Sequence, residues 1–399
     1  MHRLGLAIIT ALAFNVLVIC PASASGPPWN MTPPVRVIFD TDMYGDIDDA
    51  LALAMLHAFE GRGEIELLAV TISTQAKWPA RFVHVINTFY GRGGIPIGVV
   101  SGGVTPQILE ASRFGRYLPS PDGINFTQYV ARDEPDATAH EEAVTLLRRV
   151  LVDQPDQSVV LIGVGYMTNL ARLLDSQPDS ASSLEGRVLV GRKVKFLSAM
   201  VGDFSATGGQ EFNLEMDVPA ARKVFEQWPT PIVVSGSEVG ARLLFPQSAI
   251  DRYFGYVDHH PIAETYNYAA RFYRQFSQQP GKPHDHATYD LTSVLYAARP
   301  EGAYFTFSGA GRVEVLEGGR ATFIPDPRGR HRILGLEDAQ EARTLEAMIL
   351  LASQPPKKQG APADTGAPCR VADQRVLTTC SRQSPARSAA PASWQCGTC

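Results

Sequence analysis

The sequence lacks the features typical of nucleic-acid-binding, repeat and dinucleotide-binding proteins. It has no excess of basic residues, since 36 Lys and Arg stand against 41 Asp and Glu and the formal net charge is −5 at pH 7. That charge gives no indication of binding to nucleic acid or to anionic membranes. We also find no internal repeat and no G-x-G-x-x-G motif that opens a helix, so a dinucleotide-binding fold is unsupported.

Cysteine is scarce and is missing from the middle of the chain. Apart from Cys20, the cysteines all lie in the last 31 residues: Cys369, Cys380, Cys396 and Cys399. An even number in an oxidising compartment predicts two disulfides within this tail. Metal binding or redox chemistry at the final Cys-Gly-Thr-Cys is the alternative, although no His lies nearby to complete a zinc site.

The first 24 residues have the composition of a secretory signal peptide. A short basic start precedes an apolar run from Leu4 to Cys20, and Ala22-Ser23-Ala24 supplies a small-residue cleavage site. We predict cleavage after Ala24, so that the mature protein is periplasmic or secreted and keeps no stable membrane anchor. An uncleaved anchor is the alternative, but the apolar run is short for a membrane span.

The middle of the chain alternates strand-like and helix-like stretches. Strands are predicted at 35–39, 64–74, 95–100, 158–164, 194–199 and 231–235, and helices at 50–56, 80–90, 139–152, 169–174 and 219–225. This alternation predicts an α/β fold with an open, mostly parallel, Rossmann-like sheet and helices on both faces. We predict a catalytic domain over residues 34–352. Residues 353–399, rich in Pro, Ala, Ser and Gln, are predicted to form a flexible extension.

The most informative stretch is Val35 to Leu56, VRVIFDTDMYGDIDDALALAML. Five carboxylates lie within ten positions, between the predicted strand and the predicted helix: Asp40, Asp42, Asp46, Asp48 and Asp49. Like charges this close repel one another unless a cation sits among them or protons are shared. Helix capping would explain one or two of the five. Because ligands bind at the carboxyl ends of strands in open α/β sheets, our first interpretation is a hard divalent cation held by oxygen atoms.

Two known acidic signatures fit this stretch poorly. An EF-hand loop that begins at Asp40 would place Tyr44 at its fifth position and Leu51 at its twelfth, where a bidentate Glu is required. A strand also enters the loop where an EF-hand needs a helix. A phosphatase with an aspartyl nucleophile could use Asp40-Thr41-Asp42, but three of the five carboxylates would then have no role.

A third signature fits better. Asp-Thr-Asp, a Gly-containing turn and Asp-Asp-Ala-Leu-Ala-Leu resemble the N-terminal motif of the nucleoside hydrolase family, inosine-uridine preferring type, although the spacer is two residues longer than the commonest family form. Three later stretches resemble further segments of the same family: Ile162–Leu174 (IGVGYMTNLARLL), Gln210–Asp217 (QEFNLEMD) and Ala287–Pro300 (ATYDLTSVLYAARP). The sequence of Asn87–Val100 (NTFYGRGGIPIGVV) resembles the secreted branch of that family.

The resemblance implies a nucleoside hydrolase fold and a role for each matching residue. It implies a Ca²⁺ site made by Asp42, Asp49, Asp290 and the Val164 backbone carbonyl. It implies Asp48 as the general base, with Asp46 as the alternative for either the base or a ligand, and Asp40 as a residue that orients the others. The implied substrate contacts are Glu211, Asn213, Asp203, Tyr289 and Lys77. Tyr289 stands where the family often has a His that assists the leaving base, and Asp203 stands where it usually has an Asn.

The residue types and spacing of Glu211 and Asn213 also suggest a binding role without the resemblance. A carboxylate and an amide two residues apart in an extended segment face the same way, which suits a grip on the vicinal ribose hydroxyls. The expected function is calcium-dependent hydrolysis of ribonucleosides, or related N-ribosides, to free base and ribose, with inversion. A non-catalytic riboside- or sugar-binding protein and a metal-dependent phosphohydrolase are the alternatives. The resemblance also implies a homo-oligomer, while purine or pyrimidine preference is not indicated.

Overall fold

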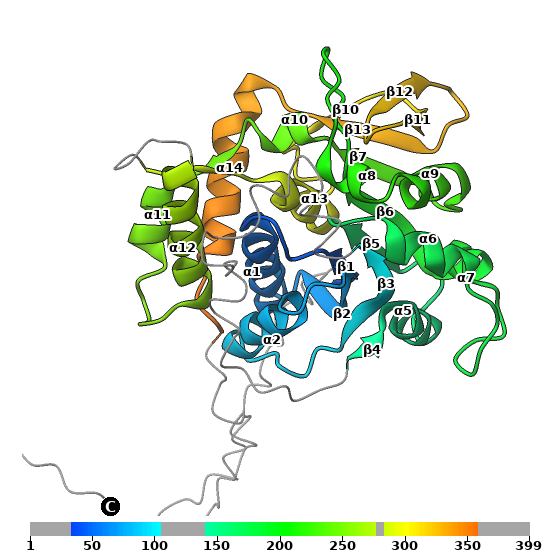
Figure 1. Cartoon of the computed structure of the whole chain (residues 1–399), viewed down its shortest axis with the longest axis horizontal. Helices are drawn as coiled ribbons and strands as arrows, with labels where there is room; N and C mark the ends of the chain where they lie inside the picture. Colours follow the sequence, from blue (N-terminus) through cyan, green and yellow to red (C-terminus); the bar gives the residue numbers. More distant parts are fainter. Residues whose placement is uncertain (1–32, 105–139, 277–282, 358–399) are drawn as a thin grey trace, which may run out of the picture. The chain divides into compact units, whose positions relative to one another are not determined.

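The computed structural model describes residues 33–104, 140–276 and 283–357 (Figure 1). The predicted signal peptide, the stretch 105–139 and residues 358–399 of the predicted extension, with all four of its cysteines, lie outside these residues. Backbone contacts divide the chain into Met1–Lys357 and Lys358–Cys399, and the description below concerns the first unit. None of the described helices combines the length and apolar character that a membrane span requires.

One large sheet organises the described residues. Its strand order is β12-β11-β13-β7-β6-β5-β1-β2-β3-β4, and β10 pairs with β13. The parallel strands are β1 (Val35–Thr41), β2 (Ile65–Thr74), β3 (Ile97–Val104), β4 (Glu141–Glu142), β5 (Val159–Gly163), β6 (Val194–Met200), β7 (Ile232–Ser235) and β13 (His331–Gly335). Antiparallel pairs join β10 (Thr306–Phe307), β11 (Gly311–Val315) and β12 (Ala321–Pro325) at one edge. The prediction of a mostly parallel α/β sheet is therefore confirmed.

Helices cover both faces of this sheet, as predicted (Figure 1). One face packs against α1 (Asp48–Gly61), α2 (Pro79–Phe89), α12 (Pro261–Phe276), α13 (Tyr289–Ala298) and α14 (Asp338–Ala352). The other packs against α5 (Ala143–Val152), α6 (Thr168–Asp175), α7 (Gly186–Lys193) and α9 (Val218–Gln227). Side chains of β1 alternate between the two cores, since Val37 and Phe39 join the first and Ile38 joins the second.

Short elements complete the described chain. These are α8 (Phe212–Met216), α10 (Ser237–Gly240), α11 (Gln247–Tyr253), and the small antiparallel pair β8 (Leu244–Phe245) and β9 (His286–Ala287). Two local expectations are corrected here. The extended backbone ends at Glu211, because Glu211 is the N-cap of α8 and accepts hydrogen bonds from the backbone N–H groups of Asn213 and Leu214, which are already helical. Asp290 does not precede its helix but lies in the first turn of α13.

Candidate active site

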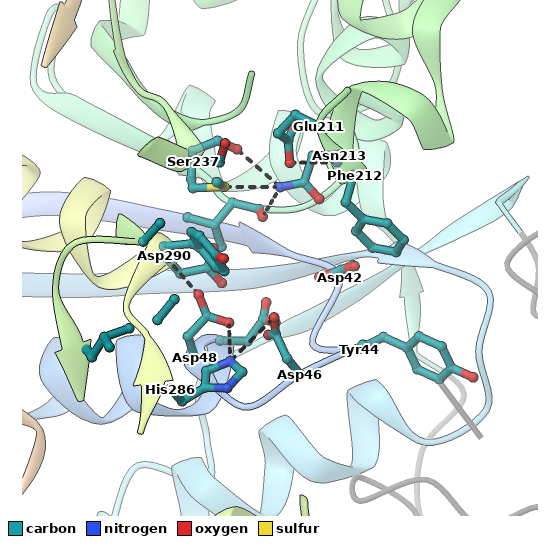
Figure 2. A pocket seen from close by; sticks show the side chains of 18 of the residues that line it. Asp42, Tyr44, Asp46, Asp48, Glu211, Phe212, Asn213, Ser237, His286 and Asp290 are labelled. Carbon is teal, nitrogen blue, oxygen red and sulfur yellow. Dashed lines mark hydrogen bonds and ion pairs between the residues drawn. The ribbon is translucent and has the colours of Figure 1, made fainter. Parts of the chain in front are cut away.

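A cavity of about 540 Å³ opens at the carboxyl ends of β1, β5, β6 and β7. Residues from several separate segments line it, and Figure 2 shows most of their side chains. Asp42 and Asp46 come from the β1–α1 turn, and Asp48 and Asp49 come from the first turn of α1. Val164 follows β5, and residues 211–213 come from the start of α8. Asp290 and Tyr289 come from α13. The fold therefore brings together, in one cavity, motifs that lie far apart in the sequence.

The β1–α1 turn is shaped so that its carboxylates face inward. Two positions have positive φ, Met43 (46°) and Gly45 (104°), and they turn the chain sharply after β1. Asp49 Oδ1 accepts hydrogen bonds from the Thr41 hydroxyl and from the Met43 N–H, the latter at 3.1 Å. The N-cap residue of α1 is Ile47, and no side chain makes a capping hydrogen bond there. Asp48 and Asp49 therefore do not act as the N-cap of this helix.

Three carboxylates converge at the centre of the cavity. One oxygen from each of Asp48, Asp49 and Asp290 lies within 4.8 Å of the others, and all three residues are buried. The backbone N–H of Asp290 donates to Asp48 Oδ2 at 3.0 Å, which fixes α13 against α1. Burial, and then the charge of neighbouring aspartates, holds the pKa of Asp48 and of Asp290 well above the usual range, and raises that of Asp49 to about 7.

Asp42 and Val164 line the same cavity. Asp42 is 3% exposed, and burial followed by the charge of Asp49 holds its pKa well above the usual range. Among the described residues, its buried Oδ2 atom has no hydrogen-bond partner. Val164 lines the cavity, and its carbonyl accepts a hydrogen bond of 2.8 Å from the Asn213 side-chain amide.

Asp40 lies one layer deeper and does not line the cavity. Its Oδ1 accepts hydrogen bonds from the Thr71 hydroxyl and, at 2.7 Å, from the Asn169 side-chain amide. Burial raises its pKa to about 7 although both hydrogen bonds act in the opposite direction. Because its backbone carbonyl also accepts from Val164 N–H at 2.8 Å, Asp40 ties β1 to the turn that carries Val164.

Glu211 and Asn213 line the cavity as predicted, although by a different local geometry. Glu211 Oε2 accepts hydrogen bonds from the N–H groups of Gly202 (2.9 Å) and Leu214 (3.1 Å), and Oε1 accepts from Asn213 N–H (2.9 Å). Its own N–H donates to the Gly319 carbonyl at 2.7 Å, so the β11–β12 turn supports it from behind. The carboxylate is thus held rigidly at the cavity wall.

Two of the predicted substrate contacts lie elsewhere. Asp203 accepts hydrogen bonds from the N–H groups of Ser205 and Gly209, at 2.9 and 2.8 Å, and so shapes its own Gly-rich loop. Lys77 is exposed, with Nζ 4.8 Å from the centre of the Trp78 ring. Neither residue is among those that line the cavity.

His286 is a cavity residue to which the sequence assigned no role. Its Nε2 lies 3.5 Å from Asp46 Oδ2 and 4.0 Å from Asp48 Oδ1, and its Nδ1 lies 3.1 Å from His284 Nε2. Burial lowers the pKa of His286, and burial with the charge of His286 lowers the pKa of His284 to about 4. The closeness of two His residues to Asp290 in the sequence was a signal, but their direction depends on the pairing of β8 with β9.

The donor set suits a hard cation. Asp42, Asp48, Asp49 and Asp290, whose side chains carry oxygen ligands, line the cavity together with Val164, and no described lining residue is Cys. Several like-charged groups are buried together, and Asp42 has an oxygen that no described donor satisfies. A divalent cation would remove both penalties at once.

Comparisons with known proteins agree with this geometry. The family model for inosine-uridine preferring nucleoside hydrolases matches residues 37–353. The non-specific ribonucleoside hydrolase RihC of Salmonella newport is similar, with 25% identity over 276 residues that cover 68% of this chain and 81% of that protein. Among solved structures, the purine-preferring ribonucleoside hydrolase from Gardnerella vaginalis aligns with a TM-score of 0.60 and 17% identity, over 81% of this chain and 99% of its own.

A second solved structure shows the same fold. The inosine-uridine preferring nucleoside hydrolase from Bacillus anthracis aligns with a TM-score of 0.57 and 16% identity, over 80% of this chain and 99% of its own. At these identities the structural matches establish the fold, while the family match extends over the whole cavity-forming region.

Proposed function

The chain belongs to the inosine-uridine preferring nucleoside hydrolase family, and we propose that it hydrolyses the N-glycosidic bond of ribonucleosides to free base and ribose in a Ca²⁺-dependent reaction. The observation that carries this proposal is the convergence of Asp48, Asp49 and Asp290 in a cavity that Glu211 and Asn213 also line. Oxygen ligands for a cation and hydrogen-bonding groups for a sugar diol are thus side by side.

In this proposal Asp42, Asp49, Asp290 and the Val164 carbonyl hold the cation. When bound, Ca²⁺ supplies a positive charge that orients the sugar hydroxyls and makes a neighbouring water more acidic. Calcium is favoured over magnesium because the donors are oxygens from separate elements rather than a compact octahedral set. Asp40 keeps β1 and the Val164 turn in register, so that the ligands remain close together.

The protein residues then perform the remaining work. Cleavage passes through a sugar with oxocarbenium character, and a water must attack the anomeric carbon opposite the leaving base. Asp48 is proposed as the general base, since its Oδ2 is fixed by Asp290 N–H while its Oδ1 faces the cavity near His286. Asp46, which is partly exposed and whose pKa burial raises to about 6, is the alternative base. Glu211 and Asn213 hold the ribose hydroxyls, and attack from one side leads to inversion.

We further propose, on sequence grounds, that the signal peptide directs the protein to the periplasm or the exterior and that the mature chain assembles as a homo-oligomer. The nucleosides it meets there would be scavenged.

The proposal is tested by measuring release of base and ribose from a panel of purine and pyrimidine nucleosides, with Ca²⁺ and with EGTA. The variants are Asp48→Asn and Asp46→Asn, with the exposed α11 residue Asp251→Asn as the matched control. We expect calcium-dependent release that falls about 10²–10⁴-fold in Asp48→Asn and is unchanged in Asp251→Asn. Activity that survives in Asp48→Asn but is lost in Asp46→Asn reassigns the base.

Two other outcomes contradict the proposal. Ribose or nucleoside binding without turnover in the calcium-loaded wild type identifies a binding protein on the hydrolase fold. Release of phosphate from phosphomonoesters, with no release of base, identifies a phosphohydrolase.

A further inference from the structure

A second cluster of ligand-type side chains lies beside the proposed Ca²⁺ site. One ligand atom from each of Asp46, Asp48 and His286 lies within 4.8 Å of the other two, and none of these residues is a proposed Ca²⁺ ligand. Asp48 also has an oxygen within 4.8 Å of Asp49 and Asp290, so the two groups adjoin. Asp48 and His286 are buried, whereas Asp46 is partly exposed and offers an ion a route from solvent.

The donors of this cluster differ in kind from those of the Ca²⁺ site. His286 contributes an imidazole nitrogen, whereas the proposed Ca²⁺ ligands are all oxygens. Calcium prefers oxygen ligands, but Zn²⁺, Mn²⁺ and Fe²⁺ accept imidazole together with carboxylates. One His and two Asp also leave a coordination position open to water. The donor set therefore fits a transition-metal ion rather than a second Ca²⁺.

The separations within the cluster suit a shared ion better than direct hydrogen bonds. His286 Nε2 lies 3.5 Å from Asp46 Oδ2 and 4.0 Å from Asp48 Oδ1, and Figure 2 shows the ring directed at both carboxylates. An N–H···O hydrogen bond normally spans about 2.7–3.2 Å. Two ligands that each lie about 2.1 Å from a tetrahedral ion are about 3.4 Å apart. The first separation already fits such an ion, and a small rotation of the Asp48 carboxylate brings in the second.

A second histidine supports the first, independently of the carboxylates. His286 Nδ1 lies 3.1 Å from His284 Nε2, so one of these two nitrogens donates its proton to the other. With that proton on His286 Nδ1, the lone pair of Nε2 is directed at the two carboxylates. Metal-binding histidines are typically held in this way, by a hydrogen bond from the other ring nitrogen to an outer acceptor. The pairing of His286 with the buried Phe245 in the β8–β9 ladder fixes the backbone that carries the ring.

Asp46 belongs to the β1–α1 turn, which is two residues longer than the commonest family form. We propose that Asp46, Asp48 and His286 bind one transition-metal ion, of the Zn²⁺ or Mn²⁺ type, at a site separate from that of Ca²⁺. Such an ion takes an oxygen of Asp48 as its ligand and so removes the proposed general base from the attacking water. Occupation of the site therefore inhibits hydrolysis, a consequence that rests on the proposed function, whereas the binding of the ion does not.

The site is tested with Co²⁺, whose visible absorption reports coordination by nitrogen and oxygen, added to the calcium-saturated full chain. We expect saturable binding that Zn²⁺ displaces. His286→Gln should weaken it about a hundredfold, and His284→Gln about tenfold, because the latter removes only the outer hydrogen bond. Asp46→Asn, on the exposed side of the cluster, should match His286→Gln and avoids the risk that a buried variant misfolds. The control is His259→Gln, since His259 is exposed and pairs with Glu264.

An absent Co²⁺ signal, or one that persists unchanged in His286→Gln and Asp46→Asn, overturns the inference. Kinetics add a second readout. Zn²⁺ should inhibit release of base by the calcium-loaded wild type, with an inhibition constant that rises about tenfold or more in His286→Gln and is unchanged in His259→Gln. Inhibition that excess Ca²⁺ relieves places zinc in the Ca²⁺ site and also overturns the inference.

The failure of this inference and that of the proposed function can be told apart. Release of base without the Co²⁺ signal overturns the inference and leaves the proposed function intact. A Co²⁺ signal that depends on His286 and Asp46, without release of base from any nucleoside, supports the metal site and overturns the proposed function.

Discussion

The acidic turn and the surroundings of Arg148 both bury charge, but they do so in opposite ways. Arg148, on α5, is 2% exposed, and the chain supplies every partner that its guanidinium meets. These are both carboxylate oxygens of Asp179 (2.7 and 3.1 Å), the Ser176 hydroxyl (2.9 Å) and the carbonyls of Ser182 and Leu184 (2.9 Å each). In the cavity, by contrast, carboxylate oxygens of Asp48, Asp49 and Asp290 lie within 4.8 Å of one another.

The difference distinguishes a buried charge that the protein itself neutralises from buried carboxylates that need a bound cation. Beside Arg148, hydrogen bonds from the guanidinium lower the pKa of Asp179, so the pair is stable in its ionised form. In the cavity, burial and like charge raise the pKa of Asp42 and Asp48 from the acidic turn and of Asp290 from α13. Folding alone does not favour that arrangement, and an external cation makes it favourable.

The largest expected effect comes from removing one carboxylate of the acidic cluster. Asp290→Asn should lower kcat/KM roughly 10³-fold, about 4 kcal/mol, because a proposed cation ligand is lost. The calcium-free variant should melt at a higher temperature than calcium-free wild type, because a buried like charge has been removed. Steady-state kinetics and thermal melts with EGTA test both parts. A lower melting temperature without calcium would show that Asp290 has a structural role like that of Arg148.

The second expected effect is the reverse, a loss of stability without a loss of activity. Arg148→Met should destabilise the fold by about 3 kcal/mol, because Asp179 and two carbonyls lose their partner. The folded fraction should keep wild-type kcat/KM and calcium affinity, since α5 contributes nothing to the cavity. Urea unfolding and kinetics at 25 °C provide the measurements, with the exposed pair variant Arg192→Met as the control. A loss of kcat/KM in fully folded Arg148→Met would remove the distinction between the two regions.

The pH dependence of stability should differ with and without calcium. Asp40 and Asp49 have folded-state pKa values of about 7, against an ordinary value of 3.8 for an aspartate side chain. The unfolded chain therefore releases these protons at lower pH than the folded protein, and calcium-free stability should fall as pH rises from about 4 to about 7. Calcium at a hundred times its Kd should restore about 2.7 kcal/mol near pH 8 and much less at pH 5. Calorimetric melts across this range decide it, and an equal calcium effect at both pH values would contradict the raised pKa values.

The smallest expected effect concerns the backbone contact that positions Glu211 rather than a buried charge. Gly319 has a φ of 72°, and a Cβ there would lie 2.7 Å from the Glu215 Cα. Gly319→Ala should displace the carbonyl that accepts Glu211 N–H, and so raise KM about tenfold with a smaller change in kcat. Gly63→Ala is a suitable control, because it has a positive φ of 75° but no atom within 4 Å of a new Cβ. An unchanged KM would show that Glu211 is positioned without the β11–β12 turn.

The sequence predicted the acidic turn and the sheet well, for physical reasons. Period-two and β-branched patterns in 64–74 and 158–164 specify strands by local chemistry, and β2 and β5 occupy them. Five aspartates in one strand-to-helix turn are so unfavourable without a cation that they point to a site wherever the chain folds.

Other features depended on tertiary structure that local patterns do not contain. Glu211 was expected in an extended segment, but the carbonyl of Gly319, far along the chain, holds it as a helix cap. His286 faces Asp46 because β9 pairs with β8, and neither two-residue strand has a sequence signal. Arg148 lies on an ordinary amphipathic helix, and its burial depends on the loop that follows α6.

The hydrogen bond from Asp290 N–H to Asp48 joins residues that are 242 positions apart. During synthesis on a ribosome, the first aspartates emerge long before their last partner. The acidic turn must therefore remain hydrated until α13 has been synthesised and has docked against α1, because closing so long a loop precedes the contacts that reward it. A fragment that ends just before Asp290 would contain every other carboxyl group of the cavity and yet no assembled site. The protein thus becomes capable of chemistry late in its own folding, when nearly the whole catalytic domain is in place.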